Sequence, residues 1–353
     1  MARRIFVTDC LLGVAALGLL SGCGEPVETV SVQAKAETEQ VLSVGDAADD
    51  PAIWRNGAEP ASSLVFGTDK KAGLYVYGLN GKVIQFLPVG RVNNVDLVEA
   101  PEFGGVVVAA SNRTTPGVSL FKFVPGAAQT VPFNPGFLPL DVAEPYGLCM
   151  AKTGETILIA VTSKQGDLRL ITLRRENGVV VSDIIALPKL GSVSEGCVFD
   201  AKAGHLYVAE ENVGIWRLGI SQGADPAPAM FAELDGAILN ADIEGLALDK
   251  SVSPPLLVAS SQSDDAYAVF DTGSGAFIGK FTVAASELID GASHTDGIDL
   301  APGDFGADYP NGLLVVQDDS NSGADAPQTN QGGEKGQNFK FISWADVLTA
   351  LGR

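Results

Sequence analysis

The chain has 353 residues, and its 43 acidic against 23 basic side chains give a formal net charge of −20 at pH 7. Nucleic acid binding requires clustered Lys and Arg, so this charge argues against a nucleic acid partner. Because 46% of the residues are hydrophobic, the chain can bury a large core, which excludes a disordered acidic tail.

The N-terminal segment has the pattern of an export signal. Arg3 and Arg4 precede a short apolar run at residues 11–20, too short to span a membrane as a helix. The run leads into Leu-Ser-Gly-Cys, which resembles a bacterial lipobox and makes Cys23 the expected lipidated first residue of the mature chain. An ordinary cleaved signal with an incidental cysteine is the alternative. We expect a signal peptide over residues 1–22 and an exported lipoprotein, in the periplasm, at the outer membrane or at the cell surface. Its contact with a membrane would be through the lipid anchor only.

Residues 23–40 have the composition of a linker, and residues 41–353 are predicted to form one domain built from a repeat. Each unit has a short apolar strand opened by a polar residue, then a turn and a second apolar strand. The units begin at DDPAIW, NNVDLV, EPYGLCM, SEGCVF, DIEGLAL and HTDGIDL. Their opening residues recur every 46 to 52 positions, at Asp50, Asp96, Tyr146, Glu195, Glu244 and Asp296. Six such units predict an all-β fold, a six-bladed β-propeller.

The opening residues should meet at one mouth of the central channel, because the first strand of each propeller blade lines that channel. Five of them are acidic and would form a ring: Asp50, Asp96, Glu195, Glu244 and Asp296. Turn-capping carboxylates, common at strand starts, are the alternative for any one position. Without cations, so many adjacent carboxylates would have strongly raised pKa values. Oxygen ligands at this density suit calcium, with several ions.

Basic residues follow the second strand of three consecutive units, at Lys70 and Lys71, Arg113 and Lys164. Together with calcium they would bind a highly anionic oxygen ligand, with phosphate the leading candidate. The sequence contains no Gly-rich phosphate loop, and its two histidines stand outside the motifs of histidine phosphatases. The remaining chemistry for a phosphate ester is attack on phosphorus by a metal-activated water.

Two cysteines, Cys149 and Cys197, fall in the predicted mature domain. They could pair in an oxidising compartment. Their isolated positions between apolar residues instead favour two small buried side chains that are not bonded.

Motifs from about Gly45 to the C-terminus resemble those of the β-propeller phytases. They include DAADDPAIW, GTDKKAGLYVYGLNGKVIQ, GRVNNVDL, SEG, DIEGL, TDGID and QNFKFISW, in the family's order. The resemblance implies calcium-dependent hydrolysis of the phosphomonoesters of myo-inositol hexakisphosphate (phytate) or of other anionic phosphate esters. It implies metal ligands at Asp49, Asp50, Glu195, Glu211, Asp242, Glu244, Asp296 and Asp318. It implies phosphate contacts from Lys70, Lys71, Arg113, Tyr146 and Lys164. The catalytic residues that it implies are Lys70, Arg113, Tyr146, Lys164 and Glu195.

Two other functions stay open. Six-bladed propellers also serve as calcium-dependent lactonases and esterases, which need one buried calcium and an apolar pocket rather than a ring of Lys and Arg. A non-catalytic propeller could instead bind partners at the cell surface. The pattern also departs from the phytases at Gln165, where the family often has Glu. We expect the protein to be a monomer.

Overall fold

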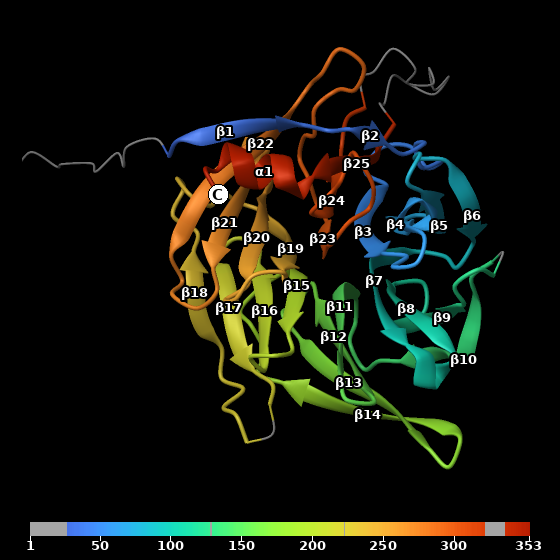
Figure 1. The fold of residues 1–353 in the computed structure, drawn as a ribbon. Helices are drawn as coiled ribbons and strands as arrows, with labels where there is room; N and C mark the ends of the chain where they lie inside the picture. The colour runs from blue at the N-terminus through green and yellow to red at the C-terminus, as the bar shows by residue number, and fades with distance from the viewer. Residues whose placement is uncertain (1–26, 128, 222, 322–335) are drawn as a thin grey trace, which may run out of the picture.

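The computed structural model describes residues 27–127, 129–221, 223–321 and 336–353. The predicted signal peptide and Cys23 lie outside the described residues. Six small sheets stand around a central axis, and the chain passes once around the ring (Figure 1). The predicted six-bladed β-propeller is confirmed. No helix among the described residues has the length and apolar character needed to cross a membrane.

The first four blades are antiparallel sheets of four strands that are consecutive in the sequence. Blade 1 contains β3 (Ala48–Trp54), β4 (Leu64–Asp69), β5 (Gly73–Gly78) and β6 (Val83–Leu87). Blade 2 contains β7 (Val92–Ala100), β8 (Gly105–Asn112), β9 (Gly117–Phe123) and β10 (Val131–Pro139). Blade 3 contains β11 (Pro145–Thr153), β12 (Thr156–Ser163), β13 (Leu168–Glu176) and β14 (Val179–Leu187). Blade 4 contains β15 (Ser194–Asp200), β16 (His205–Glu210), β17 (Gly214–Gly219) and β18 (Ala229–Glu233).

The last two blades each include a strand from the N-terminal part of the chain. Blade 5 contains β19 (Ile243–Asp249), β20 (Leu256–Ser261), β21 (Ala266–Asp271), β22 (Phe277–Ala284) and, outermost, β1 (Thr29–Gln33). Blade 6 contains β23 (Ile298–Pro302), β24 (Gly312–Asp318), β25 (Asn338–Ser343) and β2 (Ala36–Glu37). Helix α1 (Trp344–Ala350) follows β25, and the short 3-10 helices are η1 (Pro60–Ser62), η2 (Pro101–Phe103) and η3 (Gln262–Asp264).

The N-terminal strands close the ring, so the linker prediction for residues 23–40 is wrong where the structure describes them. β2 pairs antiparallel with β25, with Ala36 opposite Phe341, and β1 runs parallel to β22 (Figure 1). Blade 6 has only three strands from the C-terminal part, and β2 supplies the fourth. Pairing satisfies backbone groups that would otherwise form an open sheet edge. The two ends of the chain are thereby joined in one blade.

Apolar side chains from neighbouring blades form the cores between them. Between blades 1 and 2, for example, Phe66 of β4 and Phe121 of β9 belong to one buried cluster, and the Trp54 and Phe123 rings meet edge to face at 4.9 Å. Inner strands are buried on both faces, as in β3, whereas the outermost β14 is largely exposed. Because the inner strands are closely packed on both faces, they form the rigid wall of the channel.

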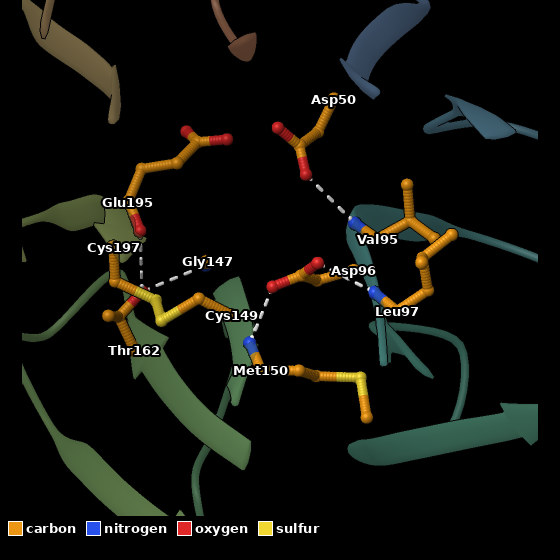
Figure 2. The surroundings of a disulfide bond; sticks show 10 residues. All are labelled: Asp50, Val95, Asp96, Leu97, Gly147, Cys149, Met150, Thr162, Glu195 and Cys197. Carbon is orange, nitrogen blue, oxygen red and sulfur yellow. Dashed lines mark hydrogen bonds between the residues drawn. A yellow bond between two sulfur atoms is a disulfide. The ribbon is translucent and has the colours of Figure 1, made fainter. Parts of the chain in front are cut away.

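Cys149 on β11 and Cys197 on β15 form a disulfide between the inner strands of blades 3 and 4 (Figure 2). The prediction of two unbonded cysteines is therefore wrong. The sequence places the two residues 48 positions apart, whereas the ring brings their Cα atoms to 5.6 Å, a separation that suits a disulfide. The bond links two channel-lining strands directly below the predicted mouth.

Loss of this disulfide should destabilise the protein. Closing a loop of this length restricts the unfolded chain. In a chain-entropy model this adds about 4 kcal/mol to the free energy of unfolding. We expect the double variant Cys149→Ala, Cys197→Ala to unfold at lower denaturant concentration than the oxidised wild type, with wild type under reducing conditions as the control. Equal midpoints for all three samples would contradict this expectation.

Candidate functional site

The opening residues of the blades come together because a glycine follows most of them. A Cβ on Gly147 would lie 1.7 Å from the carbonyl oxygen of Glu195, and one on Gly196 would lie 2.0 Å from that of Glu244. No side chain fits at such distances, so adjacent inner strands touch backbone to backbone. The Gly245 amide donates to the Asp296 carbonyl at 2.8 Å, which repeats the contact in the next blade. The carboxylates of Glu195 and Glu244, which precede Gly196 and Gly245, therefore converge.

The centre of the site is a buried group of three glutamates from blades 4 and 5. Glu195, Glu211 and Glu244 each offer a carboxylate oxygen, and these oxygens lie within 4.8 Å of one another. Glu195 and Glu244 are 2% and 5% exposed. The amide of Asn93 donates to Oε1 of Glu195 at 2.7 Å and fixes the orientation of that carboxylate. Three acidic groups at this spacing repel one another unless protons or cations lie among them.

Lys70 supplies positive charge beside this group. Its Nζ contacts Asp49 at 2.9 Å, Asp296 at 2.8 Å and Asp46 at 2.5 Å, and the residue is only 8% exposed. Burial acts to lower the pKa of Lys70, but the three aspartates outweigh it and raise that pKa. Lys70 is thus a permanent cation that joins the carboxylates of blade 1 to Asp296 at the start of blade 6.

Burial is the main cause of raised pKa values in the cluster. It brings the pKa values of Asp49, Glu195, Glu211 and Asp296 each to about 7. The charge of Asp296 raises the pKa of Glu195 further, while Lys70 opposes the increase for Asp49, Glu195 and Asp296. Burial raises the pKa of Glu244 well above its usual range as well. At neutral pH, protons therefore compete with any metal for these oxygens.

Cations and an aromatic ring stand on one side of the acidic group. The Lys164 ammonium lies 4.5 Å and the Arg113 guanidinium 5.8 Å from the centre of the Tyr146 ring. Arg113 also donates to the Lys70 carbonyl at 3.3 Å, which ties it to blade 1. The negative charge of Glu195, followed by burial, raises the pKa of Tyr146, so its hydroxyl stays protonated. Positive side chains and oxygen ligands thus share one mouth of the channel.

The remaining predicted residues take different places. Asp50 is buried, and its Oδ2 accepts from the Val95 amide at 2.9 Å (Figure 2). Asp242 is half-buried, and its charge raises the pKa of Glu211, so it lies at the edge of the glutamate group. Lys71 is exposed, and its ammonium donates to the Val44 carbonyl. Lys71 therefore points away from Asp49 and Asp296.

Asp96 and Asp318 do not join the cluster. Asp96 accepts from the backbone amides of Leu97 and Met150, deeper along the channel (Figure 2). The expectation that it completes the ring at the mouth is wrong. Asp318 lies in blade 6, where its Oδ2 is 3.3 Å from the buried ammonium of Lys340 and its Oδ1 accepts from the Ser293 amide. The partner of Asp318 is therefore Lys340 of its own blade, and not Lys70, Arg113 or Lys164.

Sequence reasoning missed three polar residues of the site. Asp46 binds Lys70, Asn93 orients Glu195, and the side chain of Gln262 donates to Asp296 at 2.6 Å. Asp46 and Asn93 stand inside the motifs DAADDPAIW and NNVDLV, and that proximity was the available signal. Gln262 follows the second strand of blade 5, the position that carries Lys or Arg in blades 1 to 3.

The cluster fits a hard divalent cation. Oε1 of Glu211 and Oε2 of Glu244 are buried and accept no hydrogen bond from the described residues. Buried acceptors without donors are costly in a folded protein. All of these ligand atoms are oxygens, from several carboxylates with no Cys or His among them, which is the donor set that calcium prefers.

The fold and the site define a β-propeller whose channel mouth combines buried oxygen ligands with side chains suited to phosphate. A family model described as Phytase matches residues 6–353. A 3-phytase of Bacillus subtilis (strain 168) is 35% identical over 336 residues, covering 91% of this chain and 85% of that relative. The chain therefore belongs to the phytase family.

A solved structure of a luciferin-regenerating enzyme is similar in fold, with a TM-score of 0.55 over 87% of this chain and 95% of that chain. The two sequences share 9% identity, so this similarity shows the fold alone. Membership of the phytase family favours phosphate ester hydrolysis over the lactonase, esterase and binding-module alternatives.

The raised carboxyl pKa values predict how the stability of the metal-free protein depends on pH. Unfolded Asp and Glu titrate near pH 4, whereas these groups titrate at about 7 when folded. Between those values the folded state holds more protons, so its stability falls as pH rises from about 4 to 7. Lys70 keeps its proton throughout. We expect the melting temperature in chelator to fall from pH 5 to pH 8.

Glu211→Gln should make this fall shallower, because one of the titrating groups is removed. Melting curves at constant ionic strength test both expectations. If the melting temperature of Glu211→Gln falls with pH as steeply as that of the wild type, Glu211 does not titrate with a raised pKa.

Proposed function

We propose that this phytase is calcium-dependent and acts on phytate or other anionic phosphate esters at the mouth formed by Lys70, Glu195 and their neighbours. The observation that carries the proposal is the pairing of buried carboxylates that lack hydrogen-bond donors with Arg113 and Lys164 beside them. An acidic cluster alone would repel phosphate. Carboxylates filled by calcium, next to the positive side chains of Arg113 and Lys164, attract it.

Calcium would be held by two groups of residues. Glu195, Glu211 and Glu244, with Asp242 at the edge, form one group, and Asp49 and Asp296 form the other, with Asp50 close by. When bound, calcium would neutralise the carboxylates, coordinate phosphate oxygens and activate a water for attack on phosphorus.

The protein's own side chains would orient the substrate. Arg113 and Lys164 flank the Tyr146 ring and can each donate to phosphoryl oxygens, with Arg offering two parallel hydrogen bonds. The protonated Tyr146 hydroxyl is a further donor. Lys70 begins as the partner of Asp49 and Asp296. If calcium takes these aspartates, the Lys70 ammonium becomes available for the phosphate.

Phosphate release from phytate, measured with calcium and after chelation, is the experiment that tests the proposal. We expect release only with calcium. Calcium should also raise the melting temperature, because a ligand at 100 times its Kd stabilises the folded state by about 2.7 kcal/mol. Full activity in chelator, with the melting temperature unchanged by calcium, would exclude the calcium site.

Variants of Glu195 and Lys70 should separate metal binding from phosphate binding. Glu195→Gln keeps the size but removes a ligand charge, so calcium affinity by calorimetry and turnover should both fall. Lys70→Ala removes the cation that competes for Asp49 and Asp296, so calcium should bind more tightly while turnover falls. Losing one such contact typically costs about 10²–10³ in rate.

Lys189→Ala is a matched control, since its ammonium pairs with Asp167 on the surface of blade 3. It should behave as the wild type. Near wild-type phosphate release by both site variants would show that the residues are assigned wrongly.

We also propose that the protein is exported and carries lipid on Cys23, as the N-terminal pattern predicts. A diacylated and N-acylated cysteine binds membranes through several chains, whereas one chain binds weakly. The wild type should therefore sediment with membranes after expression in a bacterium, and Cys23→Ala should not. Mass spectrometry of the mature N-terminus checks the modification, and an unmodified Cys23 would refute the anchor.

A further inference from the structure

The channel has a second mouth, at the end of the inner strands opposite the carboxylate cluster. Each inner strand begins at the cluster and runs away from it, through a constriction lined by Val95, Cys149, Cys197 and Ile298. The space in this constriction is about 30 Å³. Beyond it the channel opens into a cavity of about 810 Å³, reached by residues near the ends of the same strands, such as Met150 and Leu248. The rear cavity is thus separated from the predicted catalytic mouth.

The rear cavity has the size and lining of a small-molecule site. Ligand pockets typically enclose about 300–1,000 Å³ and combine mostly apolar walls with a few polar groups. Here Met150, Val198, Leu248, Val252 and Pro254 supply apolar surface. Phytate carries charge over its whole surface and has no apolar part to bury here. The lining therefore indicates a ligand of another class.

Basic residues gather around this cavity in a chain that is otherwise strongly acidic. Lys202, Lys250 and Arg217 all line it, and none of them belongs to an ion pair among the residues that the structure describes. By contrast, Lys152 on the same lining is paired with Glu102 at 2.9 Å. Cations on a cavity lining that lack an ion-pair partner among the described residues favour the binding of an anion.

A buried tyrosine holds Arg217 at the wall of this cavity. Tyr207 of β16 is on the lining of the cavity, its side chain is fully buried, and Arg217 and Thr272 lie within hydrogen-bonding reach of its hydroxyl. Arg217 on the adjacent strand β17 lies close enough to lower the pKa of His205, after burial, which has the larger effect. Thr272 adds a second hydroxyl to the lining. A guanidinium offers five N–H donors, so the contact with Tyr207 leaves donors on Arg217 that an anionic ligand would satisfy.

The acidic residues of the cavity are already held by the protein. Asp96 accepts from the amides of Leu97 and Met150, and Asp299 accepts from those of Ile53 and Leu300. Asp200 accepts from the Ala203 amide. Burial raises the pKa values of Asp96 and Asp299, and the positive charge of Lys250 partly opposes this increase. The charge of Lys250 is therefore partly compensated by these two aspartates. Arg217 and Lys202 remain as the cations of the cavity lining that are available to an anionic ligand.

We propose that the rear cavity binds a small organic anion with an apolar body, whose carboxylate or phosphoryl head group contacts Arg217 and Lys202. The apolar body would lie against Val198, Leu248 and Pro254. This site is independent of calcium and of the carboxylate cluster.

Calorimetric titration of the calcium-loaded protein with benzoate and with phenylphosphonate tests the proposal. Both probes carry an aromatic body, neither is a hydrolysable ester, and the comparison identifies the preferred head group. We expect saturable binding of at least one probe. Because a charge-assisted hydrogen bond contributes about 1.5–3 kcal/mol, Arg217→Gln should weaken that binding by about 10- to 100-fold.

Two control variants locate the binding. Arg175→Gln, in the third strand of blade 3 (β13), and Lys164→Ala, at the catalytic mouth, should both retain the affinity of the wild type. Phosphate release from phytate by Arg217→Gln should stay at the wild-type rate, which also shows that this variant is folded. The proposal fails if neither probe binds, if Arg217→Gln binds as tightly as the wild type, or if Lys164→Ala loses the binding.

Discussion

Repulsion among buried carboxylates is the constraint on which the rest of the channel depends. The backbone contacts at Gly196 and Gly245 bring the inner strands so close that the acidic residues before these glycines, Glu195 and Glu244, cannot separate. Lys70 offsets part of the repulsion between Asp49 and Asp296. In the glutamate group, burial raises the pKa values of Glu195 and Glu211 to about 7 although Lys70 and Lys164 oppose the increase, so the group still relies on protons or on a metal. Metal binding and the stability of the ring are therefore one property of these strands.

The two ends of the channel have opposite electrostatic characters. At the front, carboxylates from several blades converge and the basic residues stand to one side. At the rear, the carboxylates of Asp96 and Asp299 are bound to backbone amides, and the cations Lys202 and Arg217 are unpaired among the described residues. The Cys149–Cys197 disulfide lies at the narrow part between the two ends. A single set of inner strands thus presents two different chemical environments.

Much of the fold could be predicted from the sequence, because a repeat of 46 to 52 residues with two apolar strands per unit has few other solutions. Details that depend on neighbours in space could not. The partner of β2 is β25, at the far end of the chain, and no local pattern reveals that pairing. Asp96 opens its repeat as the other acidic residues do, yet its side chain turns to the Met150 amide. The pairing of Lys70 with three aspartates likewise depends on side-chain direction rather than on spacing.

Closure by β2 also determines when folding can finish. Ala36 pairs with Phe341, so the last blade is incomplete until almost the whole chain is available. Contacts between residues so distant in sequence form slowly, because the loop between them must close first. An N-terminal strand that waits for its C-terminal partner ties completion of the channel to completion of the chain. For a protein that is synthesised from its N-terminus, the ring is the last feature to form.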